Sequence, residues 1–298
     1  MSCRLIDADY LRANPPPDPA EDGDKHSRGR VLVVAGSVEV AGAALLAGLG
    51  ALRAGAGILQ IATCNSNAAH LGMAMPEAMV IGCRETSGGE IDPSNADRLA
   101  DIAKDADAVL IGPGLIDEKA VAELRSELMS KAVRPIFVLD ASAFTSLRDR
   151  QEITRMQSRR IIVTPHAGEM ASFLKQDKEL IEADPLAAAQ TCARLLDAVV
   201  VMKGGRTYVV PPTEQALCFE RGPVGLGTSG SGDVLAGVMA GMAARGASQV
   251  IAAAWAVYLH GEAGRKWVKR NGRLGLLARE IAHEVPALMR DLDVPQWD

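Results

Sequence analysis

A glycine-rich segment with one acid near its middle is the part of the sequence best suited to chemistry. Residues 225–237 read GLGTSGSGDVLAG, with five glycines among thirteen residues. Backbone N–H groups at a helix start bind phosphate oxygens when no bulky side chain stands nearby. We therefore predict that Gly230, Ser231 and Gly232 form a phosphate cradle. Asp233 follows directly and is placed to take the proton of a hydroxyl group that receives a phosphoryl group.

The same segment allows two other interpretations. It can be an ordinary helix start in which Asp233 complements the helix dipole, although the number of glycines favours a function. Residues 225–230 also fit the dinucleotide fingerprint G-x-G-x-x-G. That match is weak, because a hairpin-like stretch precedes it and no acid ends a second strand downstream. The chain has no G-x-x-x-x-G-K-[ST] segment, which excludes a P-loop.

Four more polar side chains follow predicted strands. Asp140 comes after FVL, where burial without a partner is costly, so it is either exposed at the strand end or in contact with a cation. His166 follows a proline turn and is either a structural hydrogen-bonding residue or a functional one. Glu169 is a candidate supporting residue, or an acid in the first turn of the next helix. Lys203 ends an apolar strand before two glycines, and its ammonium group either reaches a phosphate or extends to solvent.

The elements that must position these residues alternate along the chain. Apolar runs predict strands at 30–36, 57–63, 78–83, 107–114, 134–144, 160–170 and 198–205, followed by an antiparallel pair at 206–212 and 216–222. Helices are predicted at 42–55, 119–129 and 178–197 and in three closing segments. This alternation predicts an α/β fold with a mostly parallel sheet flanked by helices on both faces. The strand ends should meet at one edge of that sheet, namely Gly36, Gly112–Gly114, Asp140, Thr164–His166 and Lys203–Gly205.

Composition restricts the class of protein. The 298 residues are 48% hydrophobic and 23% charged, with a net charge of −5 and ten aromatic residues, which disfavours a nucleic-acid partner. Five scattered cysteines without a C-x-x-C pair predict neither a zinc site nor a disulfide framework, and hence a reducing cytoplasm. We expect no signal peptide and no membrane span. Residues 1–28 are predicted to form a proline-rich arm that is an appendage to a single domain at 29–298.

Read in order, seven segments resemble the ADP- or ATP-dependent NAD(P)H-hydrate dehydratases, a branch of the ribokinase-like superfamily. The resemblance runs from about Gly29 to the C-terminal helix, nearly the whole chain. No single segment is specific, whereas GPGL, TPHAGE and GSGD in this order are. The segments are VLVVAGS with GAALLAGLGALRAGAG, AMPEAMV, VLIGPGL, VLDASAF, TPHAGEM, VVMKGG, and GTSGSGDVLAG with AVYLHGEAG.

The resemblance implies a repair reaction, in which a nucleotide gives up a phosphate while a hydrated nicotinamide ring is returned to NADH or NADPH. It implies Asp233 as the base and ADP or ATP with Mg²⁺ as cofactors, and a homo-oligomer such as a tetramer. No metal ligand is assigned to a side chain. The implied nucleotide-binding residues are Lys203, Gly204, Gly205, Arg206, Thr207 and Gly232. The implied contacts to the hydrated cofactor come from Ala43, Gly114, His166 and Asp233.

The chain departs from the family pattern at three positions that bear on substrate contacts. Ile116 stands in place of a glycine, Ser142 in place of an acid, and Arg279 in place of an aspartate. One alternative function is a small-molecule kinase of the same superfamily acting on a sugar or vitamin alcohol. Another is a nucleotide-binding module without catalysis. The segments TPHAGE and GPGL favour the dehydratase, and the retained Asp233 favours an enzyme.

Overall fold

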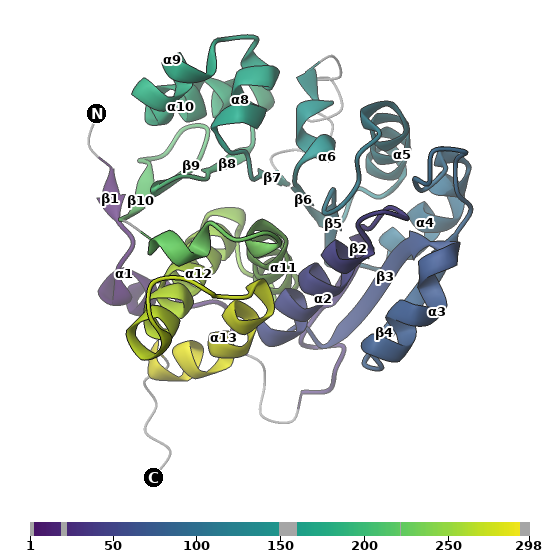
Figure 1. Ribbon diagram of the computed structural model, residues 1–298, viewed down its shortest axis with the longest axis horizontal. Coiled ribbons are helices and arrows are strands. Elements are labelled where there is room, and N and C mark those ends of the chain that lie inside the picture. Colours follow the sequence, from purple (N-terminus) through teal and green to yellow (C-terminus); the bar gives the residue numbers. More distant parts are fainter. Residues whose placement is uncertain (1–2, 19–22, 149–159, 221, 293–298) are drawn as a thin grey trace.

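The computed structural model describes residues 3–18, 23–148, 160–220 and 222–292, and within them ten strands form one sheet. The order across the sheet is β1-β10-β9-β8-β7-β6-β5-β2-β3-β4 (Figure 1). The strands are β1 (Arg4–Leu5), β2 (Arg30–Val34), β3 (Ile58–Cys64), β4 (Ala78–Cys83), β5 (Ala108–Ile111), β6 (Ile136–Leu139), β7 (Ile161–Val163), β8 (Val199–Met202), β9 (Arg206–Val210) and β10 (Leu217–Glu220).

The mostly parallel arrangement predicted from the sequence is confirmed. Strands β2 to β8 pair in parallel with their neighbours, because helical crossovers return the chain to the same edge each time. The predicted antiparallel pair is also present as β9 and β10. β9 pairs antiparallel with β8 as well, so the sheet changes direction after Met202.

Helices cover both faces of the sheet (Figure 1). One face carries α1 (Ala8–Ala13), α2 (Ala41–Arg53), α3 (Asn65–Ala74), α11 (Ser231–Ala244), α12 (Gln249–Asn271) and α13 (Ala278–Leu292). The other carries α4 (Ala96–Ala103), α5 (Glu118–Lys131), α6 (Ser142–Thr145), α8 (Ala167–Leu174), α9 (Lys178–Ala183) and α10 (Pro185–Leu196). The described residues also include the short 3₁₀ helices η1 (Pro93–Asn95) and η3 (Val224–Leu226).

The alternation of strand side chains explains this two-sided cover. In β2, Val31 and Val33 join the buried cluster under α2 and α11, whereas Leu32 and Val34 join the cluster under α4 and α5. Every second residue therefore serves a different face, and the strand is apolar throughout. None of the helices in the described part of the chain has both the length and the apolar composition to cross a membrane.

Small residues bring α2 against α11, and this contact positions the predicted site. A Cβ atom on Gly50 would lie 2.6 Å from the carbonyl oxygen of Val234, and one on Gly241 would lie 2.8 Å from the Cβ of Ala54. Larger side chains would push the two helices apart. The start of α11 is therefore held against α2, with Gly230 beside Leu46 and Val234 beside Gly50.

The first residues of the chain are part of the sheet and the core, which corrects our interpretation of them as an extended arm. β1 pairs in parallel with β10, and Ile6 and Leu11 are buried. Asp7 begins α1 by accepting a hydrogen bond from the backbone of Tyr10. The indole Nε1 of Trp255 donates to the carbonyl oxygen of Asn14 at 2.9 Å. The prolines favoured an extended interpretation, whereas the apolar residues that precede them form the strand and the helix.

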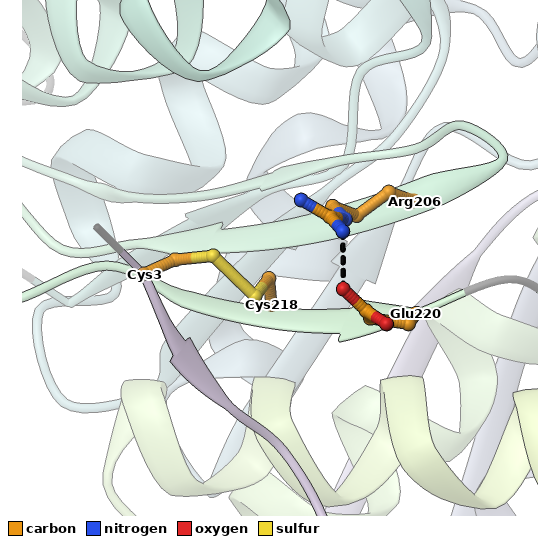
Figure 2. The surroundings of a disulfide bond; sticks show 4 residues. All are labelled: Cys3, Arg206, Cys218 and Glu220. Carbon is orange, nitrogen blue, oxygen red and sulfur yellow. Dashed lines mark hydrogen bonds and ion pairs between the residues drawn. A yellow bond between two sulfur atoms is a disulfide. The ribbon is translucent and has the colours of Figure 1, made fainter. Parts of the chain in front are cut away.

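A disulfide joins Cys3 to Cys218, which corrects the expectation that no disulfide forms (Figure 2). Cys3 directly precedes β1, and Cys218 lies on the neighbouring strand β10. The two cysteines are 215 residues apart, so their spacing carries no signal, and only the pairing of β1 with β10 brings them together. Cys64, Cys83 and Cys192 are buried thiols.

Candidate active site

Five strands that end in polar or glycine-rich loops lie side by side in the sheet. They are β2, β5, β6, β7 and β8, in that order and all parallel. Their ends therefore meet at the carboxyl edge, as predicted. Hydrogen bonds join the loops to each other. The backbone of Gly36 donates to Pro113 at 2.9 Å, and the backbone of Lys203 donates to Pro165 at 2.8 Å.

The start of α11 has the features of an anion-binding helix terminus. Gly230 precedes it with φ +83°, a conformation that favours glycine, and a Cβ atom there would collide with Leu46 on α2. No side chain of the described residues caps this terminus. The Ser231 N–H group donates to the Thr228 carbonyl oxygen at 3.2 Å, so the N–H groups of Gly232 and Asp233 are the ones available to a ligand. Ser231 and Gly232 line a cavity of about 600 Å³. The dipole of α11 favours a negative group at this point.

Most of the predicted nucleotide-binding residues share that cavity. Its lining includes Lys203, Gly204, Gly205 and Thr207, together with His166 and the apolar side chains of Phe219, Leu226, Leu235 and Val257. Arg206 lies outside the set of described residues that line it. The Arg206 side chain forms an ion pair with Glu220 on β10 (Figure 2). Alternation along β9 explains this difference, since neighbouring residues of a strand face opposite sides.

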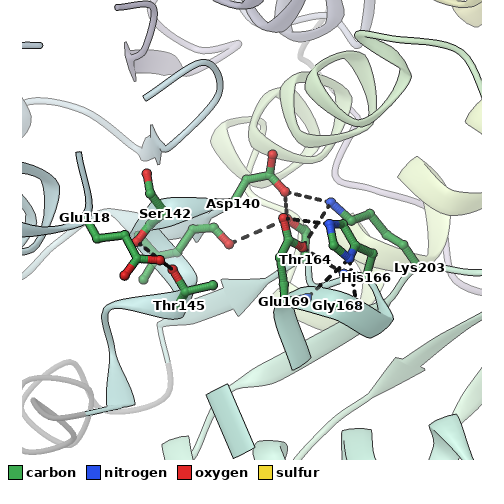
Figure 3. Close-up of polar contacts among 10 residues, drawn as sticks. Glu118, Asp140, Ser142, Thr145, Thr164, His166, Gly168, Glu169 and Lys203 are labelled. Carbon is green, nitrogen blue, oxygen red and sulfur yellow. Dashed lines mark hydrogen bonds and ion pairs between the residues drawn. The ribbon is translucent and has the colours of Figure 1, made fainter. Parts of the chain in front are cut away.

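Lys203 and Asp140 form an ion pair at the carboxyl edge (Figure 3). The Asp140 carboxylate is 4% exposed and accepts hydrogen bonds from Lys203 Nζ at 2.9 Å and Thr164 Oγ1 at 2.5 Å. Glu169 lies 3.8 Å from the same ammonium group. Burial opposes the charge on Lys203, yet the two carboxylates raise the pKa of the ammonium group above its usual value. Of the two alternatives for Asp140, contact with a cation is the one observed.

Asp233 lies in the first turn of α11 beside this ion pair. Burial and, second, the negative charge of Asp140 raise the pKa of the Asp233 carboxyl group to about 7, against the opposing charge of Lys203. A Cβ atom on the adjacent Gly232 would lie 3.7 Å from Lys203 Nζ. A carboxyl group that ionises near neutral pH is suited to accept a proton during a reaction and release it afterwards.

His166 has a structural role, and its ring also faces the cavity. Its Nδ1 accepts hydrogen bonds from the backbone of Gly168 at 3.0 Å and of Glu169 at 3.2 Å (Figure 3). In return, Glu169 accepts from the backbone of His166 at 2.8 Å, which completes a capping box at the start of α8. Because Nδ1 is an acceptor, the neutral ring carries its hydrogen on Nε2. Glu169 is therefore the first-turn acid that we had considered.

Ala43 and Gly114, the other predicted contacts to the hydrated cofactor, touch each other beside the start of α11. Gly114 has φ +68°, and a Cβ atom there would lie 2.7 Å from both Ala43 Cβ and the carbonyl oxygen of Val40. Ala43 is one turn before Leu46, which contacts Gly230. The two residues lie outside the described lining of the 600 Å³ cavity and are a separate part of the predicted site.

The three departures from the family pattern lie near this edge. Ile116 is 56% exposed, and its backbone N–H donates to the buried Glu90 carboxylate at 2.7 Å. Ser142 holds the same loop by donating to the carbonyl oxygen of Leu115 at 2.9 Å. Arg279 is exposed in the first turn of α13, next to Ala278, which approaches Gly230.

The polar residue His260 was not among the residues predicted for the site. It lies within the apolar helix α12, yet it lines the cavity and contacts Ser231. Only the packing of α12 against α11 brings the two together, and nothing in the local sequence of α12 indicates it.

This fold, with a phosphate-type cradle and a carboxylate at the carboxyl edge, is ribokinase-like. A ribokinase-like superfamily protein from Enterococcus faecalis superposes with a TM-score of 0.81 at 25% identity, covering 98% of this chain and 97% of that one. Phosphofructokinase-2 from Escherichia coli, at 14% identity and a TM-score of 0.58 over 88% of this chain and 99% of that one, shares the fold.

The chain belongs to the NAD(P)H-hydrate dehydratase family, whose model matches residues 31–287. It is 47% identical to an ADP-dependent (S)-NAD(P)H-hydrate dehydratase from Xanthomonas campestris over 96% of both chains. An ADP/ATP-dependent NAD(P)H-hydrate dehydratase from Bacillus subtilis, co-crystallised with ATP and Mg²⁺, superposes with a TM-score of 0.80 at 27% identity, covering 98% of this chain and 100% of that one.

A bifunctional NAD(P)H-hydrate repair enzyme from Moorella thermoacetica is 35% identical over 97% of this chain but only 54% of its own length. The chain thus spans about half the length of such bifunctional relatives.

Proposed function

We propose that the chain catalyses the ADP-dependent dehydration of (S)-NAD(P)H-hydrate to NAD(P)H. The observation that carries the proposal is the position of Asp233, whose pKa is about 7, beside the uncapped start of α11 and the ammonium group of Lys203. A base, an anion cradle and a cation are the parts that phosphoryl transfer to a hydroxyl group requires. The 47% identity to an ADP-dependent dehydratase supports the substrate and the nucleotide.

The chemistry requires phosphorylation because hydroxide is a poor leaving group. Asp233 accepts the proton of the ring hydroxyl group. At the same time the hydroxyl oxygen bonds to the terminal phosphorus of ADP, the bond from that phosphorus to AMP breaks, and AMP leaves. The C–O bond then breaks, phosphate leaves with the electron pair, and a proton leaves the neighbouring ring carbon to form the double bond. The hydrate and ADP are thereby converted into NAD(P)H, AMP and phosphate.

The residues at the start of α11 fit the phosphates of a nucleotide. The N–H groups of the first turn and the Lys203 ammonium group would bind the transferring phosphoryl group, where negative charge concentrates. Among the described residues, no cluster of three or more His, Cys, Asp or Glu side chains is arranged to hold a metal ion. A magnesium ion would therefore be held mainly by phosphate oxygens, and it would neutralise part of their charge.

The direct test incubates the purified protein with hydrated NADH, ADP and Mg²⁺, and follows both the absorbance of the reduced nicotinamide and the release of AMP. We expect one AMP for each NADH restored. ATP in place of ADP tests the nucleotide preference. Asp233→Asn should lower kcat by about 10²- to 10⁴-fold, the usual contribution of a general base, while ADP still binds. Asp101→Asn on α4, an exposed aspartate, is the matched control and should leave the rate unchanged.

Two results would contradict the proposal. Stable phosphorylation of a sugar or vitamin alcohol, without any restored NADH, would identify a kinase of the same superfamily. Binding of ADP without either reaction would identify a nucleotide-binding module.

A further inference from the structure

The imidazole ring of His260 contacts Ser231 of the predicted phosphate cradle and lines the cavity. His260 lies on α12, and its Nε2 is 2.8 Å from Ser231 Oγ and 3.1 Å from the Ser231 carbonyl oxygen. Ser231 is the first residue of α11 and is 6% exposed. Both residues line the cavity of about 600 Å³ together with Lys203 and Gly232. The contact therefore joins α12 to the point where a phosphate would bind.

The two distances decide which ring nitrogen carries the hydrogen. A carbonyl oxygen only accepts hydrogen bonds, so Nε2 must be the donor to the Ser231 carbonyl. Burial lowers the pKa of His260 to about 4, against the hydrogen bond to Ser231 that raises it and with a smaller lowering effect of the Lys203 charge. The ring is therefore neutral at physiological pH. A neutral imidazole has one N–H group, and Nδ1 is therefore without a hydrogen.

This tautomer fixes the role of the serine hydroxyl group. The Nε2–H group lies between the carbonyl oxygen and Oγ, so Oγ acts as an acceptor toward the ring and keeps its own hydrogen for another partner. Within the described part of the chain, Ser231 Oγ makes no hydrogen bond other than the one to His260. Because Ser231 lines the cavity, a ligand oxygen in the cavity is the acceptor within reach.

We propose that His260 is a positioning residue that holds the Ser231 hydroxyl group as a hydrogen-bond donor to a phosphate of the bound nucleotide. The proposal rests on the proposed function for the identity of that ligand. The opposite tautomer would place the lone pair of Nε2 against the carbonyl oxygen, and the ring would then compete with the phosphate for the serine hydrogen. His260 thus acts on the nucleotide through Ser231 without touching the reacting atoms.

Binding of ADP, measured by titration calorimetry, tests the proposal. A hydrogen bond to a charged group corresponds to about 10- to 100-fold in affinity, so Ser231→Ala and His260→Phe should each weaken ADP binding by that factor. The double variant should be no weaker than either single one, because both remove the same interaction. His260→Gln restores an N–H donor and should regain part of the affinity. His283→Phe, an exposed histidine on α13, is the control and should bind as the wild type does.

The tautomer can be measured without any ligand. ¹⁵N-detected NMR of the imidazole should show a protonated Nε2 and an unprotonated Nδ1 that do not change between pH 5.5 and 8. A hydrogen on Nδ1, additive losses in the double variant, or ADP binding unchanged in His260→Phe would overturn the proposal. Failure of the wild type to bind ADP at all would instead contradict the proposed function, and the NMR result would still report on the His260–Ser231 pair.

Discussion

The two parts of the site are built in different ways. Around the start of α11, charged groups dominate, with Lys203 held between Asp140 and Glu169 and with Asp233 nearby. Around Ala43 and Gly114, backbone atoms and small side chains pack in close contact, and the nearest described neighbours of Gly114 are the uncharged residues Ala43 and Val40. The first part is suited to phosphates and proton transfer, and the second holds the loop after β5 tightly against the start of α2.

This difference means that the two parts should respond to different perturbations. The charged part depends on protonation, because burial and neighbouring charges set the pKa values there. The close-packed part depends on volume, because an added methyl group has no space. Substitutions that affect one part should leave the other intact if the two are independent.

Among the substitutions that compare the two parts, Gly114→Ala should have the largest effect, and it tests the close-packed part. The new Cβ atom would collide with Ala43 and with the backbone of Val40, and φ +68° is unfavourable for alanine. A displacement of about 1 Å at this loop should lower kcat/KM for the hydrate by about 100-fold, while the Kd for ADP stays the same. Steady-state kinetics and calorimetry measure the two values.

Gly246→Ala is the control for backbone strain alone. Gly246 has φ +94°, but among the described residues a Cβ atom there would meet only Pro17, at 3.4 Å, at the opposite edge of the sheet. This variant should lose stability and keep its kinetics. An equal loss of ADP affinity in Gly114→Ala would contradict the separation of the two parts.

An intermediate effect is expected from Asp140→Asn, which tests the charged part. The wild-type kcat/KM should rise with pH and reach half its maximum near pH 7, as Asp233 loses its proton. The Asp140 charge is one cause of the raised pKa of Asp233, and the substitution removes it. Lys203, whose charge lowers the pKa of Asp233, also loses its nearest partner. The half-maximum should therefore move by about one unit to lower pH. A shift to higher pH would show that Asp233 is not the titrating group.

The smallest effect is expected from Arg206→Ala. Arg206 is exposed and pairs with Glu220 across two strands outside the cavity, and water and salt screen such exposed pairs strongly. We expect less than about a threefold change in the Kd for ADP. A loss of tenfold or more in calorimetry would place the guanidinium group on the nucleotide and would revise the assignment of the charged part.

Much of this arrangement could be predicted because it follows from local patterns. Apolar runs and their order predicted the parallel sheet, and the sheet in turn predicted that Asp140, His166 and Lys203 meet at one edge. The contact between His260 and Ser231 could not be predicted, because it depends on how α12 packs against α11. Arg206, which is predicted to bind the nucleotide, lies outside the described lining of the cavity because alternation along β9 directs it toward Glu220.

The bond between Cys3 and Cys218 converts most of the polypeptide into a covalent ring. In the chain-entropy model, closing a ring of this size lowers the conformational entropy of the unfolded ensemble and thereby stabilises the folded state by about 5 kcal/mol. It also fastens a two-residue strand that would otherwise leave β10 as an open border, where another chain could add. With both thiols reduced, only non-covalent contacts would hold β1 on the edge of β10.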